Sequence, residues 1–140
     1  MADISELKSK LANLNNALDR LTEVLDDAKV TEDDDFDVLR DASIQRFEFC
    51  FELSWKVLQG VNEFLGTPCN SPKDCIRIAA QNGLINNPEV WIDFANKRNL
   101  ASHVYDEATA KEVYAVIAYF EKTARELLTV VNNKLVVQSA

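Results

Sequence analysis

The sequence predicts an all-α protein, an up-and-down antiparallel bundle of four main helices and one short helix. Apolar residues recur at spacings of three and four along two long segments, one near each end of the chain. Glycine and proline number only three each in 140 residues, and no alternating strand pattern or internal repeat competes with the helical one. A chain of this length can bury one core, so we expect residues 1–140 to form a single helical bundle domain.

The first predicted helix carries a continuous apolar stripe. Its members are Ile4, Leu7, Leu11, Leu14, Leu18, Leu21 and Leu25. Asp3 supplies a cap, and Glu6 follows it three residues later, which is typical of a helix start. The acidic run at residues 31–35 then breaks the stripe, and we interpret it as a solvated connection rather than a metal site.

The second and third helices have clear start and stop signals. The second has an aromatic-rich stripe, which we interpret as core rather than as a cofactor site: Ile44, Phe47, Phe51, Trp55, Leu58 and Val61 or Phe64. Gly66 and Pro68 predict its end. Ser71 as a cap, Pro72 at the first helical position and an acidic residue two further on then predict a short helix that Gly83 ends.

Asn87-Pro88-Glu89 predicts the start of a fourth helix, which carries Trp91, Phe94 and Arg98 on one face and runs to or through residues 98–105. Asp106-Glu107 predicts the start of the last helix. Its apolar stripe is Val113, Ile117, Phe120, Ala124, Leu127 and Val131.

Composition excludes several classes of function. The formal net charge of −8 argues against broad electrostatic capture of nucleic acid, so any RNA contact has to be local. The first residues lack a signal-peptide pattern, and no apolar stretch approaches the length that spans a bilayer. We therefore expect a cytoplasmic protein with no membrane association.

Cysteine and histidine are too sparse to predict a metal site. Cys50, Cys69 and Cys75 form no C-x-x-C pair, and His103 is the only histidine. We expect reduced, structural thiols, with Cys69 and Cys75 exposed beside the connection after the second helix, and we expect neither a disulfide framework nor a bound metal or cofactor.

The candidate site lies between Arg98 and Tyr105. Metal-independent cleavage of a phosphodiester needs a group of near-neutral pKa and a fixed cation, and His103 and Arg98 supply that pair. Five residues correspond to about 140° around an ideal helix, so the two converge only at a helix end, a bend or a second chain. On spacing alone, a solvated arginine and a half-buried, hydrogen-bonded histidine explain the two residues better than a catalytic pair does.

Other residues of the segment have helical spacings of their own. Asn99 lies four residues before His103, so its amide is placed to orient the imidazole if the helix continues. Arg98 and Tyr105, seven apart, share a helical face on the same assumption.

The run R-N-x-x-S-H-x-Y-D-E, residues 98–107, resembles the signature of the HEPN superfamily, in the branch of nucleotidyltransferase substrate-binding proteins. Residues 44–49 and 52–56, Ser71-Pro72-Lys73-Asp74, residues 83–85 and Trp91 match that branch in order, so the resemblance spans about residues 5 to 135.

The resemblance implies a helical homodimer whose Arg-x4-His motifs face a shared cleft. It also implies a minimal nucleotidyltransferase encoded nearby that acts as antitoxin to an RNA-cutting toxin and transfers AMP to the motif tyrosine. On this basis Arg98 and His103 are the catalytic pair, Asn99 and Ser102 are supporting polar residues, and Tyr105 is the modified residue.

Two other interpretations remain open. The chain is alternatively a non-catalytic subunit that binds a nucleotide or substrate for a two-component nucleotidyltransferase, which the acidic charge fits. A purely structural helical dimer would leave the polar motif without a role. The leading hypothesis is a metal-independent endoribonuclease toxin inhibited by AMP transfer to Tyr105.

Overall fold

Helices account for nearly all of the computed structural model, which describes residues 3–139 and the side chains of residues 3–137. The α-helices, in chain order, are α1 (Ile4–Lys29), α2 (Asp33–Phe64), α3 (Pro72–Gln81), α4 (Pro88–Leu100) and α5 (Glu107–Ser139). A 3-10 turn, η1 (Ala101–His103), follows α4 directly, and the described residues contain no strand. The predicted all-α bundle of four main helices and one short helix is confirmed.

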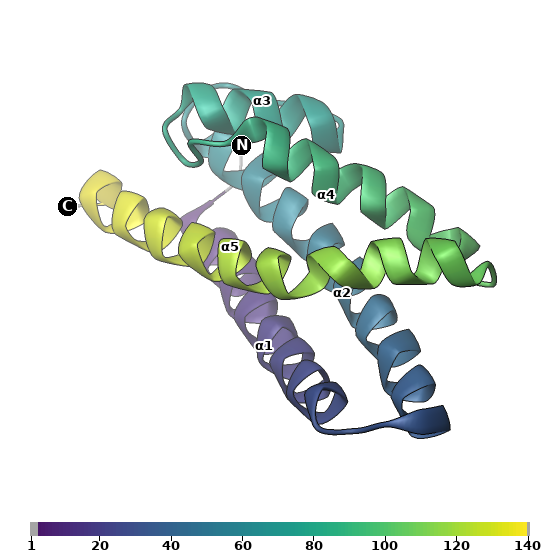
Figure 1. The fold of residues 1–140 in the computed structure, drawn as a ribbon. Coiled ribbons are helices and arrows are strands. Elements are labelled where there is room, and N and C mark those ends of the chain that lie inside the picture. The colour runs from purple at the N-terminus through teal and green to yellow at the C-terminus, as the bar shows by residue number, and fades with distance from the viewer. Residues whose placement is uncertain (1–2, 140) are drawn as a thin grey trace.

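The helices pack as a long antiparallel pair crossed by the last helix. α1 and α2 lie side by side, and α5 crosses both of them (Figure 1). α3 and α4 pack against each other and against α2, and α4 also contacts α5. The turn between α4 and α5 therefore lies beside α2, which contacts η1. None of the helices in the described part of the chain is long and apolar enough to cross a membrane.

The predicted start and stop signals are confirmed at α1 and α3. The Asp3 carboxylate accepts from the main-chain N–H of Ser5 at 2.6 Å, and Ser71 Oγ accepts from the N–H of Asp74 at 3.3 Å. Gly66 and Gly83 follow the ends of α2 and α3 with φ of +88° and +75°, a region that glycine adopts without steric cost.

One predicted boundary is wrong. We interpreted residues 31–35 as a solvated connection, but α2 begins at Asp33, so three of these residues form its acidic first turn. Carboxylates are favourable at this position because the helix N-terminus carries partial positive charge. That attraction offsets the mutual repulsion on which the prediction of a loop rested.

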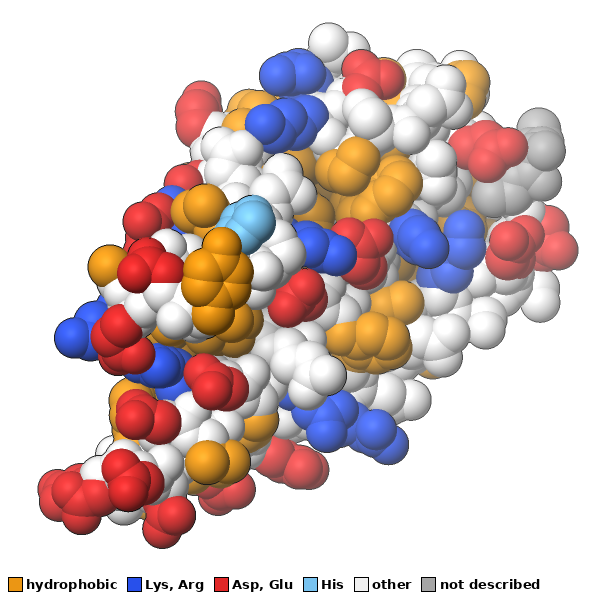
Figure 2. Space-filling view, turned by 90° about the vertical axis from the view of Figure 1, so that its right-hand side faces the viewer, with side chains coloured by type: hydrophobic (Ala, Val, Ile, Leu, Met, Phe, Trp, Pro, Cys, Tyr) orange, Lys and Arg blue, Asp and Glu red, His pale blue; other side chains and the backbone are white. Residues whose placement is uncertain are grey.

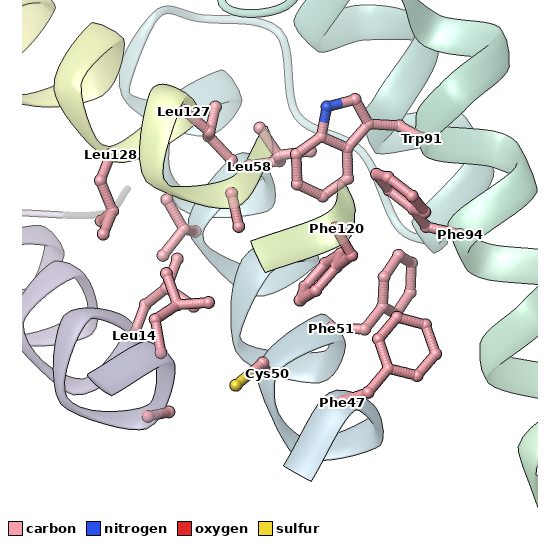
Figure 3. Packing of buried hydrophobic residues seen from close by; sticks show 14 of the residues in the cluster. Leu14, Phe47, Cys50, Phe51, Leu58, Trp91, Phe94, Phe120, Leu127 and Leu128 are labelled. Atoms are coloured by element: carbon pink, nitrogen blue, oxygen red, sulfur yellow. The ribbon is translucent and has the colours of Figure 1, made fainter. Parts of the chain in front are cut away.

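The core combines a leucine-lined region with an aromatic cluster. The stripe of α1 predicted from the sequence is buried from Leu7 to Leu25. In the aromatic cluster, the Phe120 ring of α5 lies 5.0 Å from that of Phe47 on α2 and 5.2 Å from that of Phe94 on α4 (Figure 3). Trp91 also packs edge-on against Phe120, at 6.0 Å. Phe120 thus joins α2, α4 and α5, and the interpretation of the aromatic stripe as core is confirmed.

The predicted state of the cysteines is wrong. Cys69 and Cys75 form a disulfide across a Cα–Cα distance of 5.2 Å, and both are buried rather than exposed. The loop between α2 and α3 folds over the end of α2, where the Asn62 amide donates to the main-chain oxygen of Cys75 at 3.0 Å. This contact holds the main chain at Cys75 against the end of α2. Cys50 remains a thiol in the core, where burial raises its pKa to about 12.

Candidate functional site

The segment that carries the candidate residues is not one continuous helix. α4 ends at Leu100, between Arg98 and His103, and the chain continues through η1 and a turn to the start of α5. Ala101 is buried and Val104 packs against the core, which anchors the turn while the side chains between them face solvent. A helix end is one of the three ways in which the sequence allowed Arg98 and His103 to converge.

Arg98 lies at the end of α4 against two carboxylates of α2. Its Nε donates to Glu52 Oε1 at 3.0 Å, and its Nη1 lies 3.5 Å from Glu48 Oε2. The arginine side chain is 29% exposed, so part of the guanidinium remains open to a ligand. Because a guanidinium has five donors in a rigid fork, two carboxylates can fix its orientation and leave donors free.

His103 and Tyr105 form an exposed pair. The imidazole Nδ1 lies 3.3 Å from the Tyr105 hydroxyl oxygen, and the two rings meet edge-to-face at 5.9 Å. Which atom donates depends on the tautomer, and either assignment keeps Nε2 out of this contact. Tyr105 is 86% exposed, so its hydroxyl is accessible to another protein.

The supporting residues lie differently from the sequence expectation. We expected the Asn99 amide to orient the imidazole, whereas the His103 ring instead contacts the hydroxyl of Tyr105. The expectation assumed a helix that continues past Leu100, and the helix ends there. The main-chain oxygen of Asn99 instead accepts from Ser102 Oγ at 2.9 Å, which closes the turn. Likewise, Arg98 and Tyr105 do not share a helical face.

A surface pocket adjoins Arg98. It has a volume of about 290 Å³ and is bounded by α2, by α4 and by the start of α3. Its lining includes Phe51, Glu52, Ser71, Lys73, Arg98 and Asn99. The lining thus combines one largely buried aromatic ring with a lysine, an arginine, a carboxylate and polar side chains.

The surface around the site has mixed charge. Figure 2 shows the sole histidine exposed on this face, with acidic, basic and hydrophobic side chains intermixed around it. In the part of the chain that the structure describes, no three His, Cys, Asp or Glu side chains group in a way that would hold a metal ion.

Sequence reasoning missed the residues that support the site from α2. Glu48 and Glu52 contact Arg98, and the buried Arg40 binds Glu107, the first residue of α5. A local signal existed for Arg40, because it lies four residues before Ile44 on the buried face of the helix. A charged residue on such a face predicts a buried partner.

Comparison with known proteins identifies the family of this chain. The family model described as nucleotidyltransferase substrate binding protein like matches residues 9–133. The chain is similar to a probable ribonuclease HepT of Haemophilus influenzae, with 37% identity over 89 residues. That match covers 60% of this chain and 61% of the relative, so it spans less than two thirds of the relative's length.

Solved structures share the fold. A protein of Thermus thermophilus is 31% identical with a TM-score of 0.73, and the match covers 83% of this chain and 96% of that one. A tri-AMPylated HEPN toxin of Shewanella oneidensis, solved in complex with an MNT antitoxin, has a TM-score of 0.74 at 23% identity. That match covers 95% of this chain and 99% of the toxin, and at this identity it shows the fold alone.

Proposed function

The chain belongs to the family of nucleotidyltransferase substrate-binding-like proteins, and we propose that it is a HEPN-type, metal-independent endoribonuclease, the toxin of a toxin–antitoxin pair. The observation that carries the proposal is an oriented, partly exposed arginine in the last turn of α4, followed in the turn after this helix by an exposed imidazole. The name of the Haemophilus influenzae relative supports the same activity.

In the proposed reaction, the RNA supplies its own nucleophile. The ribose 2′-oxygen attacks the adjacent phosphorus while the bond from phosphorus to the 5′-oxygen breaks, which leaves a cyclic phosphate and a 5′-hydroxyl. His103 takes the proton from the 2′-hydroxyl or gives a proton to the leaving 5′-oxygen. Arg98 binds the non-bridging oxygens, on which negative charge accumulates.

A homodimer would complete this chemistry. One imidazole performs one of the two proton transfers at a time, and a second chain would bring a second His103 and a second Arg98 to the cleft. We propose that two copies pair with their motifs facing each other. The exposure of His103 and Tyr105 on one face of the single chain supports this arrangement.

We further propose that a minimal nucleotidyltransferase is the antitoxin and that it transfers AMP to Tyr105, as the state of the Shewanella oneidensis toxin suggests. The phenol oxygen would attack the α-phosphorus of ATP, pyrophosphate would leave, and the phenol proton would pass to solvent. The new phosphodiester would place negative charge and bulk next to His103 and repel RNA.

Cleavage of a mixed RNA pool by purified protein, in the presence of a metal chelator, tests the proposed activity. We expect His103→Ala to lower the rate by about a hundredfold or more, because it removes the proton-transfer group. Arg98→Ala should have an effect of similar size, because it removes the cation that stabilises the transition state. Arg77→Ala is the matched control, since Arg77 is exposed on α3 and does not line the pocket.

Cleavage that disappears with chelator, or that survives both site substitutions, would refute the proposed mechanism. A silent wild type counts against it as well, provided that intact mass shows Tyr105 to be unmodified.

AMP transfer is tested by incubating the chain with the neighbouring nucleotidyltransferase and ATP and measuring intact mass. Tyr105→Phe should accept no AMP, whereas Tyr119→Phe should accept it as wild type does, since half-exposed Tyr119 lies on α5 beside Phe94. Modification that persists in Tyr105→Phe would place the acceptor elsewhere.

A specific observation favours the second candidate, a non-catalytic nucleotide-binding subunit. Arg98 and Lys73 both line the pocket, so a phosphate bound there would meet two cations, and His103 is not part of this lining. ATP or AMP binding to the wild type, lost in Arg98→Ala while His103→Ala binds normally and no variant cuts RNA, would favour this candidate.

A further inference from the structure

The start of α5 is attached to α2 by a bidentate ion pair between Arg40 and Glu107. Arg40 Nη1 donates to Glu107 Oε1 at 2.6 Å, and its Nη2 donates to Glu107 Oε2 at 3.1 Å. The two residues are 67 positions apart in the sequence. Such fork-to-fork contacts fix relative orientation as well as distance, because both bonds are satisfied only in one plane.

The arginine is enclosed by negative charge. Its side chain is only 8% exposed, and carboxylate oxygens of Asp37 and Asp41 lie within 4.0 Å and 3.7 Å of it. Its Nε is buried without a hydrogen-bond partner in the described structure. The bond to Glu107 raises the pKa of Arg40 and lowers that of Glu107, so the pair stays charged at neutral pH. Burial of an arginine is costly, and Glu107 supplies both of its hydrogen bonds.

Glu107 closely follows the turn that carries His103 and Tyr105. It lies two residues after Tyr105 and four after His103. Asp106 between them caps α5, accepting from the N–H of Thr109 at 3.3 Å, and its own N–H donates to the main-chain oxygen of His103 at 3.2 Å. A rotation of the first turn of α5 would therefore be transmitted within one or two residues to both exposed side chains.

We propose that Arg40 is a positioning residue for the site: by holding Glu107 it fixes the turn from which His103 and Tyr105 project. It touches neither the imidazole nor the phenol, and it acts through the start of α5. The reaction it would serve is the endoribonuclease activity proposed above, on which this assignment of role rests.

The geometry of the Arg40–Glu107 ion pair predicts the effect of a substitution at either residue. Without the guanidinium of Arg40, Glu107 loses the two parallel hydrogen bonds that hold the first turn of α5 against α2. Arg40→Lys keeps a cation but cannot make two parallel bonds in one plane, and Glu107→Gln keeps the shape but removes the charge. Both variants should loosen the turn while the core beneath it stays packed.

His103 is the sole histidine, so its imidazole gives one resolved set of NMR signals without assignment by mutation. In wild type we expect a nuclear Overhauser contact between the His103 and Tyr105 rings, because they meet edge-to-face. Arg40→Lys and Glu107→Gln should weaken that contact and shift the imidazole Cε1–H signal. The matched control is Arg125→Lys, which alters another arginine fork on α5, bound to Glu121 and to Asp19 of α1.

RNA cleavage by the same variants is the second measurement. We expect kcat to fall by about tenfold to a hundredfold with little change in KM, the pattern of a misplaced catalytic group. Arg125→Lys should retain both the wild-type His103 signals and the wild-type rate.

The outcomes separate this inference from the proposed activity. If the His103 signals and ring contact are unchanged in folded Arg40→Lys and Glu107→Gln, the positioning role is refuted, whatever the rates are. If the signals change and wild type cuts no RNA, the Arg40–Glu107 ion pair does position the turn, and the ribonuclease proposal fails. Equal changes in Arg125→Lys would reduce the effect to general destabilisation and would also overturn the inference.

Discussion

Replacing Phe120 with alanine should remove the side chain that connects three helices. The ring is fully buried and packs edge-on against Phe47, Trp91 and Phe94. Truncation of a buried phenylalanine typically costs about 3–5 kcal/mol of unfolding free energy, from lost transfer energy and the cavity left behind. Edge-to-face neighbours contribute about 0.5–1.5 kcal/mol each beyond burial, although these terms do not simply add. We therefore expect a loss of about 4–5 kcal/mol.

Urea or guanidinium unfolding followed by circular dichroism measures this loss. The midpoint should fall while the slope with denaturant stays constant, since the exposed area changes little. Tyr119→Ala is the matched control, because that neighbouring aromatic residue is half-exposed, and it should cost less than half as much. A loss below about 2 kcal/mol at unchanged slope would refute the argument that Phe120 is the central contact of the aromatic cluster.

Three further predictions concern other elements. Gly60→Ala should destabilise by about 1–3 kcal/mol in the same unfolding assay, because a Cβ there would lie 2.5 Å from Leu7 Cδ2; an unchanged midpoint would show that Leu7 moves freely. Cys50 should resist thiol reagents until the protein unfolds, since burial raises its pKa to about 12, and alkylation of native protein followed by intact mass would detect any earlier reaction. The Arg40 bond lowers the pKa of Glu107, so its stabilisation is present above the ordinary pKa of a glutamate and is lost as the pH falls through the lowered value. The difference in unfolding midpoint between wild type and Glu107→Gln should accordingly shrink as the pH falls from the ordinary pKa of a glutamate through the lowered pKa of Glu107, and a constant difference would contradict the assignment.

The sequence predicted the fold well where local rules decide the structure. The leucine stripe of the first helix, the Ser71 and Pro72 start signal and the Gly83 stop are each encoded within a few residues, and each is confirmed. At Asp33 two local rules oppose each other: acidic residues repel one another in a run, yet they are favoured at a helix start. The sequence alone does not decide between these effects.

Long-range contacts were harder to predict. The disulfide between Cys69 and Cys75 depends on the fold of the loop after α2, which packs on Asn62, and their spacing of six residues does not predict it. Arg98 and His103 were identified from their chemistry and from the family resemblance, and their roles stay a prediction. Their supports could not be found from local spacing, because Glu52 lies 46 residues from Arg98 along the chain.

A single helix holds both flanks of the exposed turn. Glu48 and Glu52 hold the residue before it, and Arg40 holds the residue after it, over roughly 18 Å of α2 at about 1.5 Å per residue. The eight residues between Arg98 and Glu107 comprise the end of α4, η1 and the turn before α5, and α2 therefore holds both ends of this connecting segment. A residue inserted into its exposed part would raise the loop above the surface without disturbing the bundle. Loop length would then set how far the imidazole and the phenol reach toward a substrate, independently of how stably the protein folds.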